Sequence, residues 1–191
     1  MAIDLDALRN RVAEFDDGEL LGPSLYTIWE PDTDKSSVVY STKYHAAIRL
    51  LGGDPVEARP LNSHYGLPAV ADLSWLRTLI RDRTVYFLGD FDPLDVLIFV
   101  AVREHLPMTY LSLTDNVLGN VANALGEGCT IGLSPQEQLA MQVLAEICPQ
   151  YRALIGPTCA ALWEVGRKLE LKALATAEVT LTVGAAGLSL E

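Results

Sequence analysis

The sequence lacks the cysteine patterns of a disulfide framework or a zinc site. Its three cysteines, Cys129, Cys148 and Cys159, lie far apart, and no two of them form a Cys-x-x-Cys motif. No histidine is close enough in the sequence to complete a zinc knuckle with them. We therefore expect all three to be reduced thiols that pack in the core.

Long apolar runs and a basic N-terminal leader are also missing. No hydrophobic stretch approaches the roughly 20 residues that a membrane-spanning helix requires. The first six residues, Met1 to Asp6, carry acidic side chains where a signal peptide carries basic ones. A hydrophobic content of 50% with 20% charged residues is typical of a globular protein. We expect a cytoplasmic protein with no membrane partner.

Positive charge is scarce. The chain has 14 Lys and Arg against 25 Asp and Glu, a formal net charge of −11, and its basic residues form no strong cluster. A protein that grips a phosphate backbone by itself usually presents a basic surface. We therefore expect nucleic-acid binding by this chain alone to be weak, and a protein partner subunit or a metal-bridged contact would compensate. The composition does not predict an oligomeric state.

Strand-like and helix-like segments alternate along the 191 residues, which are enough for one domain. This order predicts an α/β fold with a mainly parallel sheet of about four to six strands and helices on both faces. The second strand is a possible hairpin partner of the first. Strands are expected at 24–30, 37–41, 56–62, 85–88 and 109–113, helices at 3–15, 42–51, 71–80, 93–105, 135–147 and 157–175, and a strand-like or loose tail at 179–191.

Two carboxylates follow the most apolar predicted strand. Val85–Leu88 reads as a central strand covered on both faces, and Asp90 and Asp92 come directly after it. Alternation along an extended chain places these two side chains on the same side, at the sheet edge where α/β proteins bind ligands. Close carboxylates repel unless a proton or a cation neutralises them, and Mg²⁺ prefers such oxygen ligands. The motif therefore indicates a Mg²⁺ or Mn²⁺ site.

A structural explanation of the same residues stays open. Asp92 followed by Pro93 is a common start of a helix, with Asp as the N-cap and Pro at the first helical position. Asp95 would add favourable negative charge to the first turn. Capping uses one oxygen of Asp92, so a cap and a metal ligand are compatible.

The run Asp90-Phe91-Asp92-Pro93, at the end of a hydrophobic strand and before a helix, resembles the Toprim domain. The likeness is to the type IIB topoisomerase A subunit, its meiotic double-strand-break relative and the nuclease subunit of Wadjet plasmid-defence systems. Segments similar to other family features follow in the same order over about residues 37–175, namely 64–68, 108–114, 133–138 and 166–174. The resemblance implies a Toprim-like domain at 37–178, preceded by an N-terminal extension at 1–36 and followed by a tail at 179–191.

The resemblance also implies a catalytic centre for cleavage of the DNA backbone, in which Asp90, Asp92 and a Glu at the end of the first family strand hold Mg²⁺ or Mn²⁺. If that strand is 37–41, it ends at Ser41-Thr42-Lys43 and the acid is missing. If it is 24–30, Glu30 fills the position and an extra strand is inserted. The family's Gly after the motif is Asp95 here.

Two functions follow from these observations. The first is a Mg²⁺-dependent Toprim-type phosphoesterase that acts on nucleic acid, with Glu30, Asp90 and Asp92 as catalytic metal ligands, in one subunit of a larger complex. The alternative is a degenerate Toprim-like module that serves as a binding or assembly subunit. His64, in the loop that should approach Asp90, is either a phosphate contact or general acid, or an exposed loop residue.

Overall fold

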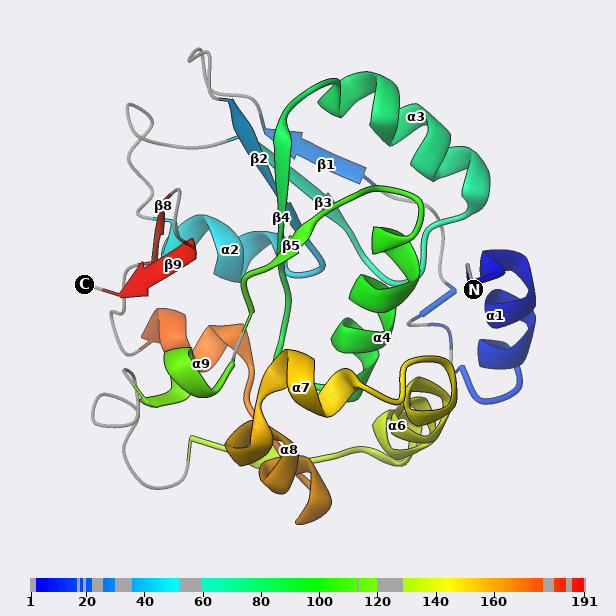
Figure 1. Ribbon diagram of the computed structural model, residues 1–191, viewed down its shortest axis with the longest axis vertical. Coiled ribbons are helices and arrows are strands. Elements are labelled where there is room, and N and C mark those ends of the chain that lie inside the picture. The colour runs from blue at the N-terminus through cyan, green and yellow to red at the C-terminus, as the bar shows by residue number, and fades with distance from the viewer. Residues whose placement is uncertain are drawn as a thin grey trace.

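The computed structural model describes residues 3–16, 18, 20–21, 26–29, 36–51, 60–112, 114–119, 129–176, 181–184 and 187–190 (Figure 1). Its centre is a five-stranded sheet in the order β1-β3-β2-β4-β5. Four strands are parallel, and β1 is antiparallel to β3 at one edge. The expected mainly parallel α/β fold is confirmed. The strands are β1 Tyr26–Trp29, β2 Ser37–Ser41, β3 Leu61–His64, β4 Thr84–Leu88 and β5 Thr109–Tyr110.

The expected hairpin between the first two strands is wrong. Tyr26 to Trp29 of β1 pair with His64 to Leu61 of β3, while β2 lies between β3 and β4. All five residues of β2 are buried, as they must be in a central strand that is covered on both faces. Both edges of β2 are paired with β3 and β4, which leaves no place beside it for β1.

Helices α2 (Tyr44–Leu50), α3 (Val70–Ile80) and α4 (Pro93–Arg103) connect successive parallel strands. The step from β2 to β3 runs in one direction across the sheet, and the steps from β3 to β4 and from β4 to β5 run in the other. Right-handed crossovers therefore place α2 on one face and α3 and α4 on the opposite face, as Figure 1 shows. Helix α4 is buried from Pro93 to Val102 and packs against α6 (Pro135–Ile147).

The expected single helix at 157–175 is interrupted. Helix α8 (Pro157–Glu164) ends before Gly166, whose φ of +71° is unfavourable for residues with a Cβ. The chain then forms β7 (Arg167–Lys168), antiparallel to β6 (Ile131–Gly132), before α9 (Leu171–Thr176) begins. Leu169 exchanges backbone hydrogen bonds with Phe91, so this segment runs beside the acidic motif.

The remaining elements complete the layers. Helix α1 (Leu5–Val12) buries Leu5, Leu8 and Val12, and its Arg11 pairs with Glu146 of α6. None of the helices in the described part of the chain is long and apolar enough to cross a bilayer. The other elements are α7 Tyr151–Ile155, α9 Leu171–Thr176 and a two-stranded hairpin of β8 Leu181–Gly184 and β9 Gly187–Leu190.

Candidate metal centre

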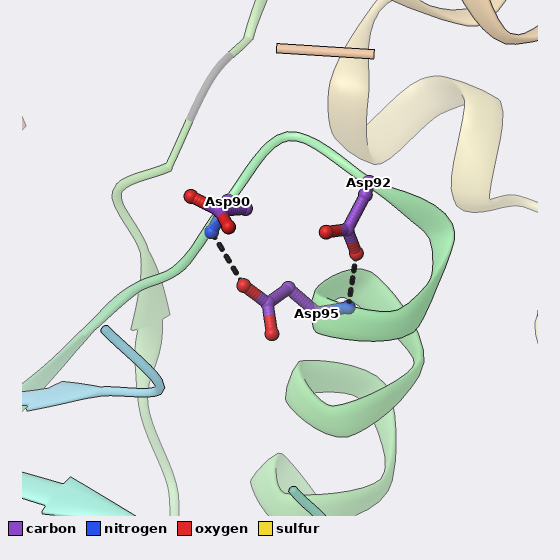
Figure 2. A group of neighbouring side chains, drawn as sticks. All are labelled: Asp90, Asp92 and Asp95. Atoms are coloured by element: carbon purple, nitrogen blue, oxygen red, sulfur yellow. Dashed lines mark hydrogen bonds between the residues drawn. The ribbon is translucent and has the colours of Figure 1, made fainter. Parts of the chain in front are cut away.

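Three carboxylates meet where β4 passes into α4. Asp90, Asp92 and Asp95 are 6%, 3% and 3% exposed, and one oxygen from each lies within 4.8 Å of the others (Figure 2). The cluster sits at the carboxyl ends of the parallel strands, where open α/β sheets place their ligands. The two predicted ligands are therefore brought together, and Asp95 joins them.

Each carboxylate is held by a backbone N–H. Asp92 caps α4 and accepts from the N–H of Asp95 at 2.8 Å, which confirms the predicted cap. Asp95 accepts from the N–H of Asp90 and, at 2.8 Å, from the hydroxyl of Thr42 at the end of β2. Asp90 accepts from the N–H of Leu171 at 2.6 Å. The three acids are thus oriented by the fold.

Gly89 makes this arrangement possible. A Cβ at this position would lie 2.8 Å from the Oδ2 atom of Asp95 and 3.0 Å from its Cβ. A Cβ contact shorter than 3.0 Å requires the neighbouring atom to shift. The absence of a side chain at residue 89 therefore allows Asp95 to approach the backbone of the strand end.

Two lysines face the acids. The ammonium of Lys43 lies 3.2 Å from Asp90 Oδ2, and its side chain is 28% exposed. The ammonium of Lys168, on β7, lies 4.0 Å from Asp92 Oδ2 and 2.5 Å from Glu137 Oε1. Both lysines thereby place positive charge where a bound cation would compete with them and a bound anion would be attracted.

Burial and mutual repulsion perturb these acids. Burial and the charge of Asp95 raise the pKa of Asp90 to about 6, although Lys43 and the N–H of Leu171 oppose the rise. Burial, followed by the charges of Asp95 and Asp90, raises the pKa of Asp92 well above its ordinary value. Burial alone would lower the pKa of Lys43, but attraction to Asp95, Asp90 and Asp92 outweighs it and the pKa is raised. Positive charge is therefore in deficit at the cluster.

The acids line a pocket with a volume of about 360 Å³, within the range of small-ligand sites. Glu137 and Glu170 also line it, so five carboxylates face the ammonium groups of Lys43 and Lys168. Buried oxygen donors with a surplus of negative charge match the preference of hard divalent cations. Asp90, Asp92 and Asp95 could hold a metal ion.

The third predicted ligand, Glu30, lies outside the described residues. The strand before it, β1, ends at Trp29 beside Leu61, where β3 begins. At the carboxyl end of β2, the other strand considered for the third acid, the chain supplies Thr42 and Lys43.

His64 is the last residue of β3 and is only 1% exposed, so the expectation of an exposed loop residue is wrong. Its Nδ1 atom is 3.0 Å from the carbonyl of Gly66. Burial lowers the pKa of His64.

Sequence reasoning missed Lys43, Lys168 and Asp95 as members of the site. Asp95 had a local signal, because a residue three positions after an N-cap faces the cap. Lys168 had no such signal in the neighbouring sequence, because it lies at the pocket only through the pairing of β7 with β6.

No family model and no curated protein matches this chain. The assignment of a function therefore depends on the geometry of the pocket and on the sequence motif.

Proposed function

We propose that the chain is a Toprim-type phosphoesterase that uses Mg²⁺ or Mn²⁺ and acts on the nucleic-acid backbone. The observation that carries the proposal is the cluster of three buried carboxylates at the carboxyl edge of the parallel sheet, with two lysines beside it. The resemblance of Asp90-Phe91-Asp92-Pro93 to the Toprim motif supports the same chemistry.

Asp90, Asp92 and Asp95 would hold the cation, which supplies an activated water and neutralises charge on the phosphate. Backbone N–H groups fix one oxygen of each carboxylate, so the ligands are oriented before the cation arrives. Asp95, which stands where the Toprim motif has a Gly, would supply the third carboxylate from α4. Lys43 and Lys168 border the same pocket and attract the phosphate as point charges.

Metal titration tests this proposal. Isothermal calorimetry should show binding of Mg²⁺ and Mn²⁺ to the wild type and its loss in Asp90→Asn, which preserves the shape of the side chain. Asp82→Asn is the matched control, because Asp82 lies before β4, at the opposite end of the strand from the cluster. Binding that is absent from the wild type, or unchanged in Asp90→Asn, contradicts the proposal.

Cleavage is a separate measurement. Cleavage of single-stranded DNA and of supercoiled plasmid should require Mg²⁺ or Mn²⁺ and should be lost in Asp90→Asn but not in Asp82→Asn. Activity that emerges only after a second subunit is added supports one subunit of a larger complex, as the scarcity of positive charge suggests.

One observation favours the alternative of a non-catalytic binding or assembly module. Lys43 stands after β2, where one alignment with the Toprim motif requires a Glu, and its ammonium satisfies Asp90 without a metal. In that case the lysines replace the cation. A wild type that binds neither Mg²⁺ nor Mn²⁺ at millimolar concentration selects this alternative.

A further inference from the structure

A second groove adjoins the metal pocket. It has a volume of about 470 Å³ and shares Thr42, Lys43 and Tyr65 with that pocket. Its walls come from α2, the end of β3 and α9, and Figure 1 shows α2 and α9 on the same side of the sheet. The groove and the metal pocket therefore meet at these three shared residues.

The groove differs chemically from the metal pocket. Tyr44, Tyr65 and Ala175 give it apolar and aromatic surface, and Tyr65 is 50% exposed. Arg49 and Lys172 are exposed cations on its lining. None of the described residues that line it is acidic, although the chain as a whole carries a net charge of −11. An apolar floor with a cationic rim suits a flat, uncharged ring joined to phosphate.

Lys43 connects the two cavities. Its ammonium lies 4.9 Å from the centre of the Tyr65 ring and 3.2 Å from Asp90 Oδ2. A nucleoside phosphate has the same two parts, an apolar base and an anionic phosphate, separated by a sugar. We propose, building on the phosphoesterase function, that this groove binds a nucleobase of the substrate whose phosphate lies at the acid cluster, with Tyr65 as the stacking surface.

This placement requires an unstacked base. A base inside a duplex is covered by its neighbours and cannot enter a groove without being flipped out, whereas a base in a single strand is free to stack on an aromatic side chain. The scarcity of basic surface also disfavours a duplex, which is bound mainly through its phosphates. The ligand is therefore a nucleoside phosphate unit, presented either by a single strand or by a free nucleotide.

Fluorescence anisotropy with a labelled oligothymidylate, in Ca²⁺ to prevent cleavage, tests the groove. Tyr65→Ala should weaken binding about 5- to 150-fold, the loss expected for one base–aromatic stack. Lys172→Gln should weaken it by a smaller factor. Arg81→Gln, a charge change at the far end of α3, is the matched control and should leave binding unchanged.

Competition experiments distinguish a single strand from a free nucleotide as the ligand of the groove. An unlabelled oligothymidylate that competes much better than thymidine monophosphate identifies a single strand, and equal competition per nucleotide identifies a free nucleotide. Three results overturn the assignment of the groove: a duplex that binds as tightly as the single strand, inorganic phosphate that competes as well as thymidine monophosphate, or wild-type affinity in Tyr65→Ala.

Calorimetry on Tyr65→Ala distinguishes a failure of the groove from a failure of the phosphoesterase proposal. Retained Mg²⁺ binding together with an unaltered affinity for the oligonucleotide refutes the nucleobase groove only. Oligonucleotide binding that depends on Tyr65 in a wild type that binds no metal refutes the metal centre and leaves the groove as a nucleic-acid-binding surface.

Discussion

Replacement of Lys43 by methionine tests the charge balance of the site. The ammonium lies 3.2 Å from Asp90 Oδ2 and is mostly buried, and methionine keeps the length of the side chain without its charge. In the metal-free protein the variant removes the ion-pair partner of Asp90 and a positive charge that attracts Asp92 and Asp95. We therefore expect lower stability and tighter metal binding in the same variant.

The cost follows from the burial of the pair. Breaking a buried ion pair by removal of one partner costs about 3–5 kcal/mol, and the partial exposure of Lys43 favours the lower end of that range. A loss of about 3 kcal/mol lowers the melting temperature of a domain of this size by roughly 6–12 °C. Arg152→Met, which breaks an exposed pair with Glu164, is the control and should leave the melting temperature nearly unchanged.

Differential scanning calorimetry measures both effects, first in EDTA and then at rising Mg²⁺ concentration. A divalent cation restores the missing charge and no longer competes with the ammonium, so Lys43→Met should gain more stability from a fixed Mg²⁺ concentration than the wild type. Plasmid nicking should nevertheless fall, because the phosphate loses an attracting charge. The double variant Lys43→Met/Asp90→Asn should recover much of the stability that Lys43→Met loses in EDTA.

Two results would refute this reasoning. Equal melting temperatures of Lys43→Met and the wild type in EDTA mean that Lys43 does not neutralise the acids. A double variant that is no more stable than Lys43→Met means that repulsion around Asp90 is not the source of the loss.

Three further predictions concern the same cluster. In EDTA the free energy of unfolding should fall as the pH rises from about 4 to about 7. The reason is that the pKa of Asp90 is raised from 3.8 to about 6 in the folded protein, so that over this range the folded chain binds more protons than the unfolded chain. Urea titrations should show a shallower fall in Asp90→Asn. Gly89→Ala should displace Asp95, lower the free energy of unfolding by about 1–3 kcal/mol and abolish metal binding. Gly132→Ala, where a Cβ meets nothing within 4 Å, should change neither stability nor metal binding. Asp92→Ser should keep the cap of α4 and lose metal binding, whereas Asp92→Ala should lose both the cap and metal binding. Thermal unfolding measures the stability, and calorimetry measures the metal binding. Equal stability of the two variants would contradict the capping role.

The sequence predicted the acidic motif well because its information is local. An apolar run before Asp90, an Asp followed by Pro93 and an apolar helix after it define strand, cap and helix within about twenty residues. The interruption of the last predicted helix also had a local signal, since Gly166 is a common type of helix terminator.

The members of the pocket beyond Asp90 and Asp92 depend on contacts between distant segments. Thr42 donates a hydrogen bond to Asp95, which lies 53 positions later in the sequence, and Leu171 donates one to Asp90, which lies 81 positions earlier. Nothing in the residues around Lys43 or Lys168 indicates that each faces a carboxylate from elsewhere in the chain. The neighbours of β1 were unpredictable for the same reason, because register between remote strands is decided by the completed sheet.

The return of residues 167–171 to the acidic motif has a consequence for the order of folding. During synthesis the strand and helix that carry Asp90, Asp92 and Asp95 emerge long before Lys168 and the N–H of Leu171, which hold two of these acids in the finished protein. Before these C-terminal partners are available, Lys43, protons or free cations must neutralise the three carboxylates. We therefore expect the ligand set to be fully ordered only after this C-terminal segment has docked.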